Sequence, residues 1–319
     1  MNTLDPDEIR PEHLAVPGTL NLCIASLQVL LLCGILVATS AVAAWWGVLG
    51  LALLYGLVMN SAYAMMHEAE HNLFHPNPRI NAAGGVVLAL FFPAPYHLMR
   101  QGHIGHHQRN RSDDEAFDLY FEGENPLWKH IQYYGILTGV FWMVIVASTV
   151  LAAVIPRFFS ISMSKLHPRF DRPTEALLET LNPKYTRSIQ AEAIAAVALH
   201  VTLILTLDIP PLRYGLVLFG FGYTWSALQY LHHFDTPRDV LNGARNVRSF
   251  RWMDKVLLNH NRHLIHHQHP TVSWRYLPAI DPNPNEKRPG LLRTYLRMWK
   301  GPRFTRERVK NHYAGKVIR

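Results

Sequence analysis

Cysteine is almost absent from this sequence of 319 residues. Cys23 and Cys33 are the only two, and both lie in one apolar run. Two cysteines exclude a disulfide framework and a thiolate metal site. They also exclude a fused rubredoxin or ferredoxin module, because such iron centres are held by four cysteine thiolates. We expect both residues to act as small hydrophobic side chains.

Charged residues are scarce as well, at 17%, whereas 49% of the residues are hydrophobic. The apolar residues are clustered. The run 20–40 has no charge and has the ~20 residues that a helix needs to cross a bilayer. A second uncharged run, 45–66, begins with two tryptophans of the kind that settle at a membrane interface. We expect these two runs to form a transmembrane helical hairpin.

Two later runs, 191–207 and 212–229, are joined by "DIPP", which suits a second hairpin. The run 84–96 is short and contains prolines, and 133–155 is flanked by segments expected on one side of the membrane. We therefore expect both to be peripheral or re-entrant, with a continuous fifth span over 133–155 as the alternative. The predicted fold is one all-α membrane domain, 1–319, with four spans and a cytoplasmic cap over 230–319.

The net charge is +8, from 31 lysines and arginines against 23 acidic residues. Basic residues gather in the segment 156–190 and in the tail after Pro282. Nucleic-acid binding is one explanation, but in a chain with several spans the positive-inside rule and anionic lipids explain it better. The acidic start "MNTLDPDEIRPEH" is unlike a cleaved signal peptide. We expect a multi-pass protein of a bacterial inner membrane, with basic loops and cap in the cytoplasm.

Histidine is the residue in excess, with 19 copies. Three clusters, called here the first, second and third boxes, read "HEAEH" (67–71), "HIGHH" (103–107) and "HLIHH" (263–267). Residues three and four apart share a helix face, so each box directs two or three imidazoles to one point. His232 and His233 follow the fourth predicted span. Eight or nine imidazoles exceed the needs of one tetrahedral ion, so we predict two metals.

The first box also satisfies H-E-x-x-H, in which two histidines bind zinc and the glutamate acts as general base in a metalloprotease. That alternative needs a third ligand. It also leaves the second and third boxes without a role.

The boxes resemble the membrane fatty acid desaturase superfamily, whose signature is HxxxH, HxxHH and HxxHH around spans. The flanks "HEAEHNLFHPNPRIN", "HHQRNRSDDEAFD" and "HHQHPTVSWRYLP" are similar too, and the likeness covers about 61–278. The resemblance implies two non-haem irons. The ligands it implies are His67, His71, His103, His106, His107, His263, His266 and His267, with His233 as the ninth. His233 is preferred because "YLHH" is similar to the family's "YLQH", although His232 stays an alternative.

Several polar residues lie close enough in sequence to orient these ligands through their second ring nitrogen. They are Glu68, Glu70, Asp113, Asp114, Glu115, Asp118 and Gln229. Five further histidines outside the boxes, treated as interface, orienting or solvated groups, are His75, His97, His130, His260 and His269.

The resemblance also implies an activity: O2-dependent removal of hydrogen from a lipid acyl chain, with desaturation as the first expectation. A hydroxylase or carotenoid ketolase is the alternative, because those enzymes share the boxes and the ending "HHQHPTVSWRYLP". A non-catalytic lipid receptor is a third class, which the intact boxes disfavour. The chain has no haem or flavin fingerprint, so a separate donor of ferredoxin, rubredoxin or cytochrome b5 type is expected.

Overall fold

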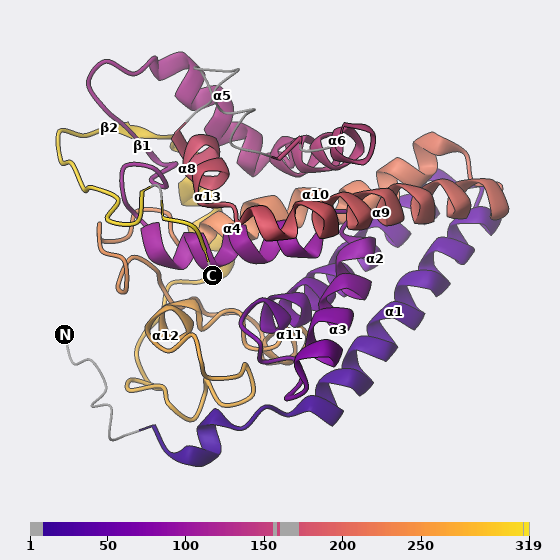
Figure 1. Ribbon diagram of the computed structural model, residues 1–319, viewed down its shortest axis with the longest axis horizontal. Coiled ribbons are helices and arrows are strands. Elements are labelled where there is room, and N and C mark those ends of the chain that lie inside the picture. The colour runs from indigo at the N-terminus through magenta and orange to yellow at the C-terminus, as the bar shows by residue number, and fades with distance from the viewer. Residues whose placement is uncertain (1–8, 156–157, 160–171, 315, 319) are drawn as a thin grey trace.

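The computed structural model is mostly helical, with long helices on one side and a looped cap on the other (Figure 1). It describes the chain except residues 1–8, 156–157, 160–171, 315 and 319. Much of the basic segment predicted over 156–190 therefore lies outside the described residues.

Helices form over all four predicted spans. They are α1 (Gly18–Ala41, after the short helix η2, Pro11–Leu14), α2 (Trp45–Glu70), α9 (Thr186–Thr206, after η3, Pro183–Tyr185) and α10 (Pro211–Leu231). Arg213, near the start of α10, donates from Nη1 to the carbonyl of Val42, 3.1 Å away, between α1 and α2. The α1–α2 and α9–α10 turns therefore meet at one end of the molecule.

The two runs expected to be peripheral or re-entrant fall on bent helix pairs. Helices α3 (Pro78–Phe91) and α4 (Tyr96–Arg109) meet at 101°, and α5 (Pro126–Leu137) and α6 (Val140–Val154) at 87°. The second bend lies at Gly139, whose φ is +81°. A Cβ there would lie 2.9 Å from the Tyr223 Cα, so the close approach to α10 also requires glycine. One straight helix over 133–155 does not form.

Three helical stretches are long and apolar enough to cross a membrane: Pro11–Ala41, Trp45–Glu70 and Pro183–Thr206. The number rises to five if each bent pair counts as one span. Helix α10 has the length but is less apolar, because Arg213 and several glycine, tyrosine and hydroxyl residues interrupt it. These helices indicate a membrane protein, while the arrangement of four spans as two hairpins stays a prediction.

The rest of the described chain forms the cap and its supports. It comprises α8 (Arg172–Thr180), α11 (Arg251–Val256), α12 (His263–Gln268), α13 (Leu291–Met298), β1 (Leu119–Tyr120) and β2 (Arg303–Phe304). The two strands pair in parallel, Leu119 with Arg303 and Tyr120 with Phe304. This small sheet, which the all-α prediction did not include, ties the tail to the loop after α4.

Helices α2 and α10 cross closely at the centre of the molecule. A Cβ on Gly56 would lie 2.8 Å from the carbonyl oxygen of Gly220, and one on Gly220 would lie 2.2 Å from that of Ala52. Only small residues allow two helix backbones to approach in this way. The crossing sits in the main hydrophobic core, and it brings the first box at the end of α2 beside His232 and His233 at the end of α10.

The cap is fastened to these helices by polar contacts. The Trp274 backbone N–H donates to Glu68 Oε2 (3.1 Å), and its indole Nε1 donates to Asn21 Oδ1 (3.0 Å). The Ser61 hydroxyl donates to the carbonyl of Val256 (2.5 Å). Buried polar groups of this kind require partners, so these contacts fix the third box over the end of α2.

Candidate metal centre

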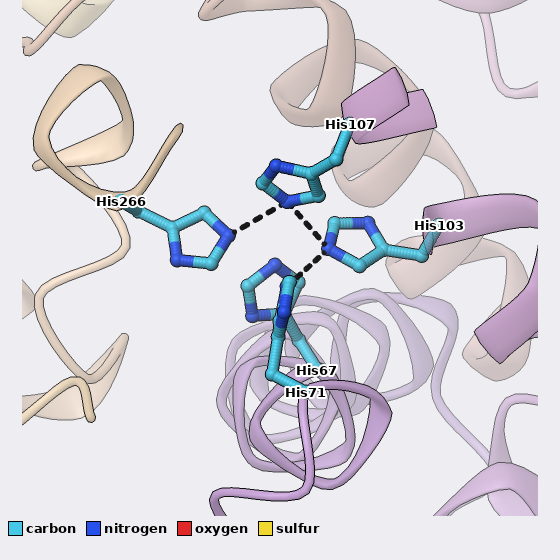
Figure 2. A group of neighbouring side chains, drawn as sticks. All are labelled: His67, His71, His103, His107 and His266. Carbon is cyan, nitrogen blue, oxygen red and sulfur yellow. Dashed lines mark hydrogen bonds between the residues drawn. The ribbon is translucent and has the colours of Figure 1, made fainter. Parts of the chain in front are cut away.

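Five histidines from three helices form the first group: His67, His71, His103, His107 and His266. Figure 2 shows their rings converging from α2, α4 and α12. The Nε2 atom of His103 lies 2.7 Å from that of His71 and 3.0 Å from that of His107. The Nε2 atoms of His107 and His266 are also 3.0 Å apart.

Four histidines form the second group: His106, His233, His263 and His267. The Nε2 atom of His233 lies 3.2 Å from that of His106 and 3.0 Å from that of His263. The groups are neighbours, because the rings of His107 and His267 stack with centroids 4.3 Å apart. The nine histidines singled out from the sequence thus divide into two adjacent groups.

The donor set of each group fits a metal ion. Within each group one nitrogen from every ring lies within 4.8 Å of the others. Imidazole nitrogens bind a transition metal at about 2.0–2.1 Å, so neighbouring ligands at right angles lie about 3 Å apart. His67 Nε2 and both ring nitrogens of His267 are buried without a hydrogen-bond partner among the described residues. Orphaned buried nitrogens of this kind are what a ligand position needs.

The third box is held in the protonation state that metal binding requires. Burial, followed by the neighbouring imidazoles, lowers the pKa of His263, His266 and His267 well below the usual histidine value. The same two causes lower the pKa of His233. Neutral imidazole has the free lone pair that a metal ion binds, whereas the protonated ring has none.

Two contacts orient rings of the second group. His233 donates from Nδ1 to the carbonyl of Gly243 (2.9 Å), which leaves the Nε2 lone pair directed at the group. His106 donates from Nδ1 to Glu115 Oε2 (2.6 Å), and Arg109 Nε lies 2.6 Å from Glu115 Oε1. Burial alone would raise the pKa of Glu115, but Arg109 and His106 lower it below its usual value. Glu115 is therefore an ionised acceptor.

The other acidic candidates have different partners. Glu70 is fully buried, and its Oε2 lies 4.0 Å from His103 Nδ1. Glu68 accepts the Trp274 N–H described above. Asp113 binds Arg238 and Arg308, and Asp114 accepts from Asn311, so both hold the tail. Asp118 binds Arg111 and the Tyr230 hydroxyl. Glu115 is the predicted carboxylate that contacts a box imidazole directly.

His260 borders both groups and His232 borders the second, and neither belongs to a group. His232 directs Nδ1 toward the carbonyl of Arg245, 3.3 Å away. The His260 ring lies 5.4 Å from that of His67 and 5.0 Å from that of His263, between centroids. Burial lowers the pKa of His260 to about 4. Sequence spacing gave no signal for His260, apart from its closeness to the third box.

A pocket lies beside these two histidines. It is lined by Asn60, Tyr63, Leu228, Gln229, His232, Ser249, Met253, Asp254, Leu257, His260, Asn261 and Leu291. Gln229, considered from the sequence as an orienting residue, therefore stands in the pocket wall. The pocket places open space next to the two histidine groups.

Other histidines away from the boxes have structural partners. His97 pairs with Glu192 across α4 and α9, and His130 bonds the carbonyl of Pro126. His75 Nδ1 accepts from the Asn77 N–H. These contacts explain the three residues without a metal.

Comparison with known proteins supplies independent evidence. The family model described as "Fatty acid desaturase" matches residues 43–302, which include all three boxes and His233. No curated protein matches the chain. Because the match covers most of the sequence, the chain belongs to the fatty acid desaturase family.

Proposed function

We propose that the two histidine groups hold two non-haem iron ions, and that the protein uses O2 to oxidise an unactivated C–H bond in a lipid acyl chain. Family membership indicates an oxidoreductase that oxidises lipid at a metal site. The observation that carries the proposal is the division of nine histidines into adjacent groups of five and four. Sets of nitrogen donors bind iron as well as other transition metals. Iron is favoured here because the family to which the chain belongs is typically di-iron.

Bound iron would supply activation of O2, which no side chain can perform. Forming a double bond removes two hydrogen atoms from the chain, which is two protons and two electrons in all. Reducing O2 to two waters takes four electrons and four protons, so two further electrons and two protons must enter. We propose that a separate ferredoxin, rubredoxin or cytochrome b5 type protein supplies those electrons.

The protein's own residues hold the rings and exclude water. Gly243 and Glu115 fix the Nδ1–H of His233 and His106, so both rings present Nε2 to the second group. His233, His263, His266 and His267 are buried. Side chains of α2 and α12 close the first group from two directions (Figure 2). Five of the nine rings are buried and four are partly exposed, so the surround limits the access of water to a reactive oxidant.

Desaturation is the outcome we propose first. We propose that the pocket beside His232 and His260, lined by side chains of α2, α10 and α11, takes an extended acyl chain. The carotenoid ketolase or hydroxylase alternative would need a pocket wide enough for a ring. Hydroxylation of an acyl chain differs only in the last step, where oxygen returns to the carbon.

The zinc protease alternative has less support. It requires Glu68 as a general base beside a metal-bound water. Glu68 instead accepts the backbone N–H of Trp274 and anchors the cap. The three further histidines of the first group would also have no purpose in a protease site.

We also propose that the boxes and cap lie on the cytoplasmic side of a bacterial inner membrane. The basic tail supports this orientation through the positive-inside rule. Both interhelical turns that meet at Arg213 would then lie on the opposite side.

The test is metal content per chain, by elemental analysis of protein purified in mild detergent, for the parent and a His263→Ala, His266→Ala variant. We expect about two irons per parent chain and strong loss in the variant, because each substitution removes a ligand from a different group. Tyr313→Ala, on the exposed tail, is the control and should keep its iron.

About one zinc that survives the double variant would overturn the iron proposal. If iron is found, product analysis with a reduced donor under O2 separates an alkene from an alcohol. Iron without turnover on any lipid would favour the receptor class.

A further inference from the structure

An exposed apolar surface surrounds the outer side of the pocket. We call it the α11–α13 surface and define it by Phe250, Trp252, Leu292, Leu296 and Trp299. Each of these side chains is between 43% and 69% exposed. A cluster of large exposed apolar side chains marks a binding surface, whereas single exposed apolar residues are common on any protein surface.

Unpaired cations accompany these apolar side chains. Arg251, Arg293 and Lys300 are exposed, and among the described residues no carboxylate pairs with them. Arg297, by contrast, pairs with Asp235 at 3.0 Å. Tryptophan and leucine beside arginine and lysine are typical of helices that lie in the headgroup region of a bilayer with anionic lipids.

A contact with a long helix places this surface beside α10. The hydroxyls of Tyr295 on α13 and Tyr223 on α10 are 2.7 Å apart. Tyr223 lies about 12 Å along α10 from its end at Leu231, because each helical residue rises 1.5 Å. Helix α13 therefore rests against α10 about 12 Å from the end of α10 that precedes His232 and His233.

Helix α5 extends the same surface. Tyr133 donates to the carbonyl of Met298 (2.8 Å), and the ring of Tyr134 stacks on Trp299. Ile131 on α5 and Phe141 on α6 are also exposed. The apolar wall thus continues from α13 to the bent pair α5 and α6 without a break in the packing.

The pocket opens between α11 and α13. The two helices start side by side, because Leu291 donates its N–H to the carbonyl of Arg248 (3.0 Å). Met253 and Leu291 line the pocket. Met253 directly follows the exposed Trp252, and Leu291 directly precedes the exposed Leu292. His232 and His260 are among the lining residues, so the pocket reaches the edge of the histidine groups.

We propose that the α11–α13 surface lies in the headgroup region and binds anionic phospholipid, and that the pocket behind it takes an acyl chain directly from the bilayer. The acyl chain then reaches the histidine groups laterally from the membrane, without a soluble carrier. The statement that the bound acyl chain is the substrate rests on the proposed function. The proposal that the α11–α13 surface binds lipid is independent of that function.

The first test measures the depth of the surface. Single cysteines at Trp252 and Leu292, in a Cys23→Ser, Cys33→Ser background, carry a fluorophore in nanodiscs containing phosphatidylglycerol. We expect quenching by spin-labelled lipid and protection from aqueous iodide. Leu30→Cys on α1 is the bilayer reference, and Leu241→Cys in a cap loop is the aqueous reference, since both positions are exposed.

Iodide quenching at 252 and 292 that equals the value at 241 would overturn the proposal. Protection from both quenchers that disappears on dilution would assign the surface to a second copy of the chain and overturn it too. Replacing Arg251 and Arg293 by glutamine should lower phosphatidylglycerol enrichment in native nanodiscs, by about fivefold for each cation. The matched control is Arg306→Gln with Lys310→Gln on the exposed tail.

The second test identifies what enters the pocket, without relying on activity or iron. A phosphatidylglycerol with a diazirine in its acyl chain should label the peptide that contains Met253 and Leu257. Leu257→Trp, which fills the pocket, should lose that label while keeping label on α1. Labelling by a diazirine acyl-CoA alone, or no label in this peptide, would overturn entry from the bilayer. Loss of iron with labelling retained would count against the proposed function only.

Discussion

The two histidine groups are built from the same helices but are held in different ways. Helices α4 and α12 supply ligands to both, whereas α2 completes the first group and the end of α10 completes the second. Two of the four rings in the second group, those of His106 and His233, are fixed by Glu115 and the carbonyl of Gly243. In the first group the nearest such acceptor, Glu70, is 4.0 Å from His103.

The first group therefore relies on helix packing, whereas the second also relies on hydrogen bonds for two of its four rings. Two histidines on consecutive turns of α2 are placed by the helix itself. His233 lies just beyond the end of α10, where the backbone no longer determines the ring direction. A hydrogen bond from its Nδ1 replaces that lost constraint.

The largest effect is expected from removing one ligand of either group. His266→Ala should empty the first group and His267→Ala the second, so that each retains about one of two irons and loses turnover. Elemental analysis and product formation measure the outcome. Exposed His312→Ala in the tail is the control. Loss of both irons from each single variant would show that the groups fill only together, which would break the comparison.

The next largest effect is expected from breaking the Arg111–Asp118 ion pair, because this pair holds the segment after α4 against α10. Both side chains are buried, and Arg111 Nη1 lies 2.5 Å from Asp118 Oδ1. Arg111→Met leaves a buried carboxylate unpaired, at a cost of about 3–5 kcal/mol. Thermal unfolding in detergent should show a clear drop in Tm. Exposed Arg251→Met should leave Tm unchanged, and an unchanged Tm in Arg111→Met would remove the pair as a support of the second group.

Glu115 and Glu70 offer a matched pair of substitutions. Glu115→Gln should weaken iron binding at the second group about 10- to 100-fold, because the ring of His106 loses its charged acceptor. Glu70→Gln should change binding at the first group much less. Iron retention during dialysis against a chelator measures both. An equal loss in the two variants would contradict the distinction between hydrogen-bonded and packed ligands.

The Arg111–Asp118 pair also predicts a dependence of stability on pH. Burial alone would raise the pKa of Asp118, but Arg111 and hydrogen bonds lower it below its usual value. Its contribution is therefore complete above the unfolded value of about 3.9 and is lost as the pH falls through the lower folded value. Tm of the parent and Asp118→Asn should converge below about pH 4. A constant gap down to pH 3 would contradict this.

The smallest effect on metal content is expected for His232. His232→Ala should keep about two irons, whereas His233→Ala should keep about one, because the ring of His233 faces the second group and that of His232 does not. Elemental analysis of the two variants shows which of these two adjacent histidines binds metal. The reverse result would exchange their roles.

Much of the site was predictable because helical spacing determines it. HxxxH places both rings of the first box in one group, as helical spacing predicts. The expectation that each HxxHH box directs its rings to one point was wrong, because His106 separates from His103 and His107, and His266 from His263 and His267. All nine predicted histidines nevertheless lie in the two adjacent groups. The acidic residues were harder. Asp113, Asp114, Glu115 and Asp118 lie within six positions, yet only Glu115 reaches a box imidazole, because the chain turns at Asn110 and Arg111. His260 was not predicted to neighbour both groups, because its contact with His67 joins segments far apart in the sequence.

The sequence by itself determined the local features: apolar runs of membrane length, box spacing, the absence of thiolate ligands and the family likeness. These depend on residues close in the chain, and helix geometry is enough to interpret them. Tertiary structure alone decided which histidines share a group, because α4 and α12 each supply both. It also decided that α11 and α13 enclose a pocket beside His260, since long-range packing sets which side chains meet across loops.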